Sequence, residues 1–399
     1  MSSPVSFSVS FSVSFSETLS PQEFFAAGNK LSRGQGQLVD VRAPIEFVDG
    51  HVPGAVNLPL LTDAERHQVG IAYKQSGQET AIELGQHLVS GDERDRRLKS
   101  WLGALKDEES VITCFRGGLR SRTVQAWCSD AGMKRPRLSG GYKACRQYLM
   151  DMTQNLVPQL NMLALSGTTG SAKTKLLRSF TSPSKLSFQI VDLEKMAHHR
   201  GSAFGGYGEP QPSQAQFENE LAVRLLQVSA EQKHEQSANP ILIEDESRLI
   251  GRCVQPEVLF TRLRASPVIL ITDDLETRTE NTFEDYILHS GINGTDLAAG
   301  LAVFDRYLVS LKNISKKLGG AMHAEVEREL RQCRVSYESA VESQANFSEC
   351  LSLNRGWIYK LLKHYYDPMY VGSLQRRDPK ILFQGSWQEV RDFLLSGSL

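Results

Sequence analysis

Two short apolar segments of this chain each run into a glycine-containing loop, and each loop is followed by helical sequence. The first segment is residues 111–113 with the loop 114–121, and the second is residues 162–165 with the loop 167–174. A strand, a loop and a helix in this order gather backbone N–H groups around one point, where they bind an anion. We therefore expect an α/β architecture with two separate anion sites.

Composition excludes several classes of protein. The chain has 399 residues, which is more than one ordinary domain. No apolar run approaches the roughly 18 residues of a membrane span, so we predict a cytoplasmic protein without membrane contact. The 45 Lys and Arg residues balance 46 Asp and Glu residues, which excludes a general polycationic surface but not a local basic face. The six cysteines form no C-x-x-C pair, so we expect reduced thiols, without a disulfide framework or a bound metal cluster.

Local sequence patterns divide the chain into a tail and two domains. Residues 1–18 repeat Ser-Phe-Ser-Val and are predicted to be a disordered, dispensable tail. Residues 19–152 and 160–399 are the predicted domains, joined by a linker at 153–159. Apolar strands that alternate with helices predict a parallel sheet in each domain. The predicted strands are 38–41, 55–60 and 111–113 in the first domain, and 162–165, 188–191, 241–243 and 268–271 in the second. Beyond about residue 295 the pattern becomes helical and charged.

The first loop opens with Cys114. Amides at a helix N-terminus favour the thiolate, which is the reactive form of cysteine. Gly117 and Gly118 permit turns with positive φ. Arg120, six residues after the cysteine, is predicted to close the loop as a bidentate donor. Arg116 and Ser121 complete the predicted anion loop. The structural alternative is a buried cysteine at the end of a strand, which is common.

Sequence around this loop resembles the rhodanese family. The resemblance rests on Asp40-Val41-Arg42, Glu46, the stretch 50–55 and Asn57. It implies a domain that carries sulfur or selenium on the loop cysteine, here Cys114. The C-x5-R spacing matches rhodanese-like phosphatases, because the common sulfurtransferase loop has its arginine one position earlier. A phosphatase therefore remains an alternative.

The second loop matches the phosphate-binding pattern G-x-x-x-x-G-K-[ST] except at one position. Backbone amides of such a loop cradle phosphates, the lysine neutralises them and the hydroxyl can hold Mg²⁺. Ala172 replaces the second glycine, which is harmless if the position is helical and impairs the loop if it needs positive φ. The predicted phosphate-binding residues are Gly167, Gly170, Ser171, Lys173 and Thr174.

Acidic residues follow two of the predicted strands in the second domain. Asp192 and Glu194 follow one strand, and Glu244 and Asp245 end another. They are expected either to hold water or a metal beside the phosphates, or to cap the next helix. Asp192, Glu244 and Asp245, together with Arg200, are therefore candidates for a supporting shell around the phosphate site.

The whole chain resembles the tRNA 2-selenouridine synthase family, a rhodanese domain fused to a P-loop domain. The order of many weak motifs carries this resemblance. They include 73–77, 84–91, 140–144, 199–205, 211–214, 217–219, 244–251, 318–320 and 365–370. The implied fold is a rhodanese-like parallel-sheet domain followed by a P-loop NTPase-like α/β domain with a helical C-terminal extension.

The resemblance implies a transferase that acts on the wobble uridine of tRNA. Such enzymes replace the sulfur of 2-thiouridine with selenium from selenophosphate, through an S-geranyl intermediate made from geranyl diphosphate. Cys114 is then expected to form an S-selanyl intermediate, and Lys173 to stabilise the departing diphosphate. Both donors are co-substrates; no tightly bound cofactor is implied, and a need for Mg²⁺ stays open. The implied partners are the tRNA anticodon arm and an enzyme that supplies selenophosphate.

Two other functions remain open at this point. One is a phosphatase or sulfurtransferase fused to a kinase-like domain, and the other is a tRNA-binding protein without activity. A tRNA substrate needs a local basic patch with faces for stacking an unpaired base. Candidate residues for such a patch are Lys316, Lys317, Arg376, Arg377, Tyr365 and Tyr366.

Overall fold

A computed structural model of the chain describes residues 17–26, 36–180, 186–206, 208, 210–234, 239–293, 296–343 and 347–397. For residues 232–234 it describes the backbone alone. The chain divides into a first unit, Met1–Asp151, and a second unit, Met152–Leu399. Of the predicted tail, residues 1–16 lie outside the described residues, and Thr18 lies in the first strand.

A parallel five-stranded sheet forms the centre of the first unit, in the order β1-β5-β4-β2-β3. Its strands are β1 (Thr18–Leu19), β2 (Leu38–Asp40), β3 (Val56–Asn57), β4 (Val111–Thr113) and β5 (Arg137–Leu138). Its helices are α1 (Pro21–Phe25), α2 (Pro44–Asp49), α3 (Asp63–Leu88), α4 (Gly91–Ala104), α5 (Leu119–Asp130) and α6 (Gly141–Leu156). Strands β2 and β4 are fully buried, so each reads as a short apolar run. Such a run is what makes them visible in the sequence.

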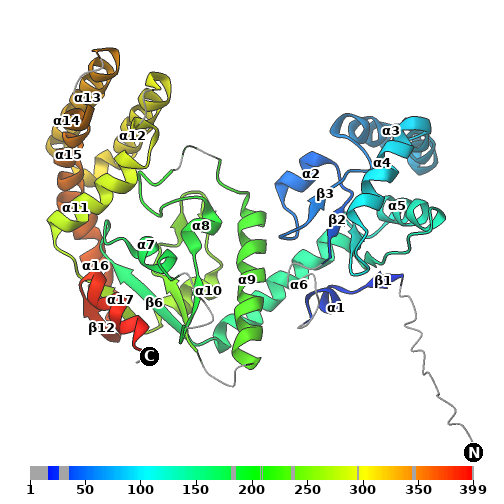
Figure 1. The fold of residues 1–399 in the computed structure, drawn as a ribbon, viewed down its shortest axis with the longest axis horizontal. Coiled ribbons are helices and arrows are strands. Elements are labelled where there is room, and N and C mark those ends of the chain that lie inside the picture. The colour runs from blue at the N-terminus through cyan, green and yellow to red at the C-terminus, as the bar shows by residue number, and fades with distance from the viewer. Residues whose placement is uncertain are drawn as a thin grey trace, which may run out of the picture. The chain divides into compact units, whose positions relative to one another are not determined.

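A second parallel sheet, in the order β12-β11-β6-β8-β7, forms the centre of the second unit (Figure 1). Its strands are β6 (Met162–Gly167), β7 (Gln189–Val191), β8 (Ile241–Glu244), β11 (Val268–Ile271) and β12 (Ile381–Gly385). A small antiparallel pair, β9 (Leu249–Ile250) and β10 (Cys253–Val254), lies apart from this sheet. The parallel sheets of both units confirm the predicted α/β fold class.

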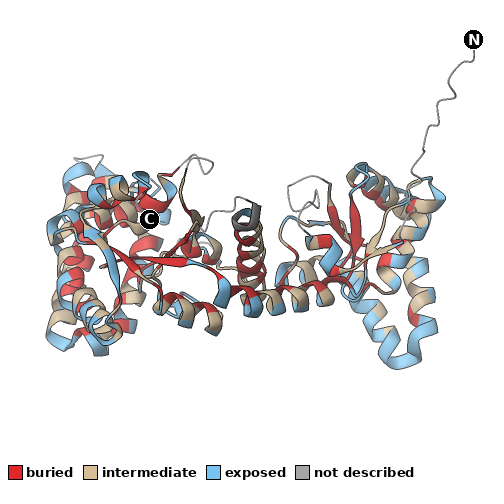
Figure 2. Cartoon of the chain, turned by 90° about the horizontal axis from the view of Figure 1, so that it is seen from below, coloured by how far each residue is buried: buried red, intermediate tan, exposed pale blue. Residues whose placement is uncertain are grey.

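Helices cover both faces of the second sheet. Alternate strand residues, such as Ala164 and Leu165 of β6, belong to two different apolar clusters, one on each face. The first cluster adds α8 (Leu193–Ala197), α9 (Gln214–His234) and α10 (Glu257–Arg264). The second adds α7 (Lys173–Arg178) and α17 (Trp387–Leu395). Figure 2 shows the central strands as buried elements.

The helical C-terminal region that the sequence predicts has its own apolar core. The helices α12 and α13 lie side by side within it (Figure 1). Its helices are α11 (Leu275–Phe283), α12 (Leu297–Leu318), α13 (Gly320–Ser343), α14 (Phe347–Ser352), α15 (Asn354–Leu361) and α16 (Asp367–Arg377). Short 3₁₀-helices occur at Val157–Gln159 and Gly291–Asn293, and short π-helices at Glu284–Leu288 and Leu362–Tyr366. Among the described residues, no helix combines the length and apolarity needed to cross a membrane.

The structure adds two features to the predicted organisation of the chain. The stretch 153–159, predicted as a linker, is helical, because α6 continues to Leu156 and the turn after it buries Val157 in the core of the second unit. Strand β12 lies in the C-terminal region, which the sequence describes as helical. It is an edge strand with partly exposed residues, so it lacks the continuous apolar run of a central strand.

Candidate functional sites

Cys114 lies where strand β4 ends and the first predicted anion loop begins. The residue is 3% exposed, and its Sγ lies 3.2 Å from the Oγ of Ser121. The thiol therefore lies beneath the loop, among apolar core residues on one side and a hydroxyl on the other. The sequence predicts its place at the end of the strand, but not the depth at which it is buried.

Backbone hydrogen bonds orient this loop. The carbonyls of Cys114 and Phe115 accept from the amides of Tyr142 and Lys143, both at 2.9 Å, and the carbonyl of Gly117 accepts from Arg137. Because the C=O and N–H of a trans peptide point in opposite directions, the N–H groups that follow point away from this packed side. In the described part of the chain, the amides of residues 115–119 donate to no other residue. The loop is therefore a set of free donors suited to an anion.

Glycines hold the loop close to the N-terminal end of α6. Gly117 has φ +63° and Gly141 has φ +60°. A Cβ atom on Gly141 would lie 2.2 Å from the carbonyl oxygen of Cys114 and 2.4 Å from the nitrogen of Gly117. Only glycine fits this close backbone approach.

Arg120 is held by a carboxylate that lies far away in sequence. Its Nη1 and Nη2 lie 2.5 and 3.1 Å from the oxygens of Glu46, which also pairs with Arg66. Burial alone would lower the pKa of Arg120, but Glu46 and the nearby Cys114 raise it. The guanidinium is therefore permanently charged close to the thiol, with its two terminal nitrogens held by Glu46. The bidentate contact predicted between Arg120 and a bound anion is not tested by these contacts.

In the second loop, too, the carbonyl groups accept hydrogen bonds from the surrounding protein while several amides stay free. The carbonyl of Thr169 accepts from Arg278, that of Gly170 from Asn281, and that of Ala172 from Trp387. In the described part of the chain, the amides of Gly170, Ala172 and Lys173 donate to no other group. Their N–H groups are therefore free to bind phosphate oxygens.

The backbone conformation of Ala172 decides between the helical and the positive-φ alternatives that the sequence left open. Its φ and ψ are 53° and 37°, in the left-handed region, so the position is one that favours glycine. An alanine there costs roughly 1–2 kcal/mol. The loop keeps its course because Trp387 holds the carbonyl of Ala172 and the amide of Leu176 bonds to the same oxygen.

We predict that Ala172→Gly stabilises the protein by about 1 kcal/mol, because glycine adopts this conformation without strain. Thermal unfolding should show a higher midpoint, and any activity that depends on this loop should stay equal or rise. The matched control is Ala302→Gly in the exposed middle of α12, where glycine should lower stability by about 1 kcal/mol. A large loss of activity in Ala172→Gly would mean that this loop is not an ordinary phosphate cradle.

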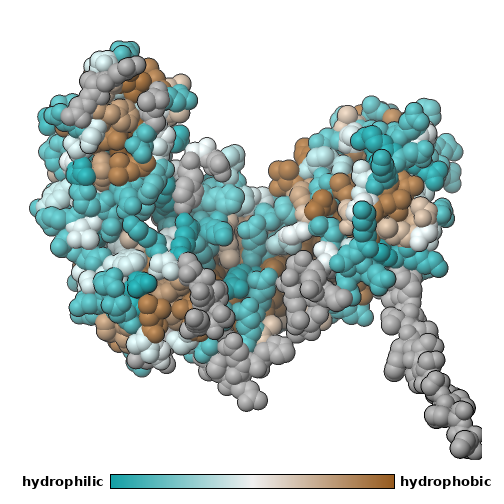
Figure 3. Space-filling view, in the orientation of Figure 1, coloured by the Kyte–Doolittle hydropathy of each residue, from teal (hydrophilic) through white to brown (hydrophobic). Residues whose placement is uncertain are grey.

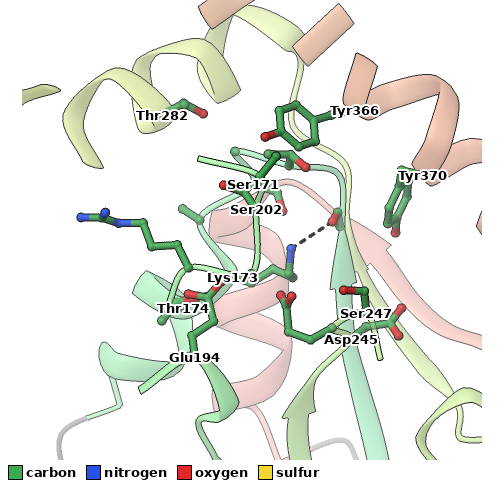
Figure 4. Close-up of a pocket in the computed structure, with 18 of the residues that line it drawn as sticks. Ser171, Lys173, Thr174, Glu194, Ser202, Asp245, Ser247, Thr282, Tyr366 and Tyr370 are labelled. Carbon is green, nitrogen blue, oxygen red and sulfur yellow. Dashed lines mark hydrogen bonds between the residues drawn. The ribbon is translucent and has the colours of Figure 1, made fainter. Parts of the chain in front are cut away.

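A cavity of about 1020 Å³ opens above the phosphate loop. Figure 4 shows Lys173 in its floor, where Nζ donates to the carbonyl of Gly167 at 3.1 Å. Burial alone would lower the pKa of Lys173, but the charges of Glu246 and Glu194 raise it above its ordinary value. The lysine is thus a fixed cation beside the free amides.

Three buried carboxyl groups surround this lysine. The hydroxyl of Thr174 lies 2.7 Å from Glu194 and 2.6 Å from Glu244. A hydroxyl has one hydrogen, so one of these two carboxyl groups must itself be protonated. Burial and mutual repulsion raise the pKa of Glu194 and of Glu244 to about 8, and burial raises that of Glu246 to about 7. The site therefore holds protons that a bound cation can displace.

These raised pKa values predict that stability falls as pH increases from about 5 to about 8. The folded protein keeps protons that the unfolded chain releases near the ordinary value of 4.5. The stabilising contribution is therefore complete below that value and is lost as pH rises through the folded pKa. Glu244→Gln, which mimics the protonated form, should reduce this fall in the thermal midpoint; each kcal/mol corresponds to roughly 2–4 °C.

The matched control for the pH prediction is Glu342→Gln at the exposed end of α13, which should keep the pH dependence of the parent protein. An equal fall in Glu244→Gln and in the parent protein would contradict the assignment of buried protons to this cluster.

The predicted supporting residues have different roles. Asp192 caps α8 and pairs with Arg178, as the capping alternative expects. Glu244 reaches Thr174 of the phosphate loop. Asp245 binds Arg377 and Ser166 instead of pointing at the loop. Arg200 lines the cavity, and its Cζ lies 5.0 Å from the centroid of the Tyr286 ring.

Two residues of the site were not singled out by the sequence. Tyr370 lines the cavity, and Arg278 fixes the phosphate loop because it donates to the carbonyl of Thr169 at 3.1 Å while it pairs with Asp367 at 2.8 Å. Tyr370 was part of the stretch 365–370, and no pattern marked Arg278. Glu246, which also lines the cavity, belongs to the acidic residues that follow the strand 241–243.

Two candidates for a basic, aromatic patch are buried, since Tyr365 is 7% exposed and the Arg377 side chain is 5% exposed and paired. These two are therefore unsuited to an exposed patch, whereas Lys317 lies at the cavity.

Known proteins resemble both units. Residues 160–398 match the family "tRNA 2-selenouridine synthase AAA domain", and residues 26–147 match the rhodanese-like domain. The tRNA 2-selenouridine synthase of Bdellovibrio bacteriovorus is 44% identical over 90% of this chain and 94% of its own length. The tRNA 2-selenouridine synthase of Nitrosomonas europaea is 42% identical over the same shares. These matches confirm the resemblance predicted from the sequence.

Proposed function

Because the chain belongs to the tRNA 2-selenouridine synthase family, we propose that it replaces the sulfur of wobble 2-thiouridine in tRNA with selenium, through an S-geranyl intermediate. One observation carries the proposal. Two loops of free backbone amides lie in separate units, one opening with a thiol and the other holding a buried lysine. Two anion sites with different chemistry suit a reaction in two steps with two anionic co-substrates.

The first step is alkylation of sulfur at the phosphate loop. The thiocarbonyl sulfur attacks C1 of geranyl diphosphate, the S–C1 bond forms, and the C1–O bond breaks. The base loses its N3 proton to water as its sulfur is alkylated, so the charge balances. The amides of Gly170 and Lys173 and the ammonium of Lys173 stabilise the charge that develops on the leaving group.

The second step is exchange of sulfur for selenium at the Cys114 loop. The Cys114 thiolate attacks the phosphorus of selenophosphate, and the phosphorus–selenium bond breaks and releases hydroselenide. The selenium bonds to C2, the C2–S bond breaks, and the geranyl thiol leaves with the proton of hydroselenide. Water then cleaves the S–P bond on Cys114 and gives phosphate, so no oxidation state changes. The free amides of residues 115–119 suit the phosphate-like anion. The S-selanyl form of Cys114 that the resemblance implies holds selenium two electrons more oxidised than selenophosphate does, so it forms no part of this step.

Apolar side chains near the first loop support an apolar group on the substrate. Hydrophobic residues gather on the surface over α2 (Figure 3), where Ile45 is 60% and Val48 is 74% exposed. Glu46, between them, contacts Arg120 at the start of α5, and Leu119 beside it is also exposed. A face with these side chains can cover a terpene chain while the amides hold an anion.

Mg²⁺ would bind at the second site together with the phosphates of the substrate, because the described residues contain no group of three or more His, Cys, Asp or Glu side chains that could hold a metal ion by themselves. The Thr174 hydroxyl and the buried carboxylates near it are the hard oxygen ligands that Mg²⁺ prefers, together with substrate phosphates. When bound, the cation neutralises diphosphate charge. Added Mg²⁺ with inorganic diphosphate is expected to raise the thermal midpoint.

Mass spectrometry of wobble nucleosides tests the proposed function. The protein is incubated with tRNA that carries 2-thiouridine and with selenophosphate, with and without geranyl diphosphate. The expected result is 2-selenouridine only when both co-substrates are present, and S-geranyl-2-thiouridine when selenophosphate is omitted. Release of phosphate from an aryl phosphate, without either nucleoside, would instead support the phosphatase alternative.

A further inference from the structure

Four side chains connect the wall of the cavity to the sheet of the second unit. The Tyr370 hydroxyl lies 2.9 Å from Ser166 Oγ, and Ser166 Oγ lies 2.5 Å from Asp245 Oδ2. Arg377 Nη1 lies 2.8 Å from both oxygens of Asp245. Tyr370 lines the same cavity as Lys173, and Ser166 is fully buried in β6.

The ion pair between Arg377 and Asp245 fixes the direction of each hydrogen bond among these four side chains. Asp245, held by the guanidinium of Arg377, is a carboxylate and only accepts. Ser166 must therefore donate its single hydrogen to Asp245. The oxygen of Ser166 then has only lone pairs left for Tyr370, so Tyr370 must donate to Ser166. The Tyr370 oxygen has no hydrogen left for a ligand.

We infer that the Tyr370 oxygen is an obligatory hydrogen-bond acceptor in this cavity and that it selects a pyrimidine whose N3 carries a hydrogen. The inference rests on the proposed function, in which 2-thiouridine enters the cavity. The N3–H of 2-thiouridine can donate to this oxygen. In 2-thiocytidine N3 carries a lone pair, so two acceptors would face each other.

The surroundings of Tyr370 suit a base. Tyr366 lines the same cavity and is half-buried there, so it supplies an aromatic side chain on which a base can stack. Recognition by a fixed acceptor also suits the chemistry, because N3 becomes more acidic as its neighbouring sulfur is alkylated. Tyr370 would thus hold the base in the orientation that turns its sulfur toward the phosphate loop.

Binding of two RNAs that differ in one base tests the inference. The probes are an anticodon stem-loop with 2-thiouridine at the wobble position and the same RNA with 2-thiocytidine. Dissociation constants are measured for the full chain and for its variants. Because phosphate contacts contribute equally to both RNAs, the ratio of the two constants isolates recognition of the base.

The parent protein should prefer the 2-thiouridine RNA by about 10- to 100-fold. Tyr370→Phe should bring the ratio close to one by weakening binding of that RNA. Ser166→Ala frees the tyrosine proton and should bring the ratio down by strengthening binding of the 2-thiocytidine RNA. Tyr359→Phe, in α15 and outside the cavity, should keep the parent ratio.

A parent ratio close to one, or a parent ratio unchanged in both Tyr370→Phe and Ser166→Ala, would overturn the inference. Formation of the S-geranyl nucleoside is measured in the same samples. Discrimination in binding without any product would contradict the proposed reaction and support the inference. If the protein binds both RNAs with equal affinity and forms product from both, the proposed reaction is supported and the inference is contradicted.

Discussion

Replacing Cys114 by serine is expected to abolish selenium incorporation while S-geranyl-tRNA accumulates. Serine keeps a hydrogen-bonding group next to Ser121 but is a far weaker nucleophile than a thiolate at neutral pH. The phosphate loop lies in the other unit and keeps its lysine and amides. We expect the yield of 2-selenouridine to fall at least about 10³-fold, with geranylation within about twofold of the parent protein, both read by nucleoside mass spectrometry.

The matched control is Cys128→Ala in α5. This thiol is buried in the same unit, and burial raises its pKa to about 11, so it is inert. The variant should keep both activities. Loss of geranylation together with selenation in Cys114→Ser would refute the assignment of separate steps to the two loops.

Lys173→Ala is expected to have the opposite effect. It removes the buried cation from the floor of the cavity and leaves three carboxyl groups without a counter-charge. Diphosphate departure should slow by about 10²- to 10³-fold, the usual cost of losing one charge-stabilising donor. Selenation of tRNA that already carries the S-geranyl group should continue at the parent rate, as measured by mass spectrometry.

Lys312→Ala provides the control for the loss of a lysine, since Lys312 is exposed on α12 outside the cavity. It should leave both steps unchanged. If Lys173→Ala slows selenation of pre-geranylated tRNA as much as geranylation, the two loops serve a single reaction.

The central strands could be predicted because buried parallel strands appear in the sequence as continuous apolar runs. Both loops could be predicted because they directly follow such runs. Residues 111–113 and 268–271 were found at the bounds that the structure gives. Strand β12 could not be found in this way, since an edge strand is partly exposed. The backbone conformation of Ala172 was also undecidable, because the sequence allowed both a helical and a left-handed residue there.

Contacts between distant residues account for what the sequence did not predict. Arg120 meets Glu46 across 74 positions, and Arg377 meets Asp245 across 132. Each arginine looked like a free cation because no local pattern shows its partner. The same reason hides Tyr370, whose role depends on Ser166 at a separation of 204 residues. Folding brings these pairs together, and only the packed structure shows which charges are neutralised.

Mixing the two inactive variants tests the separation of steps most directly. Cys114→Ser and Lys173→Ala proteins are combined with thiolated tRNA, geranyl diphosphate and selenophosphate, and 2-selenouridine is quantified. The account predicts that neither variant alone makes 2-selenouridine and that the mixture does, because S-geranyl-tRNA released by the first is a substrate for the second. A mixture as inactive as its components, although free S-geranyl-tRNA accumulates in it, would contradict the account.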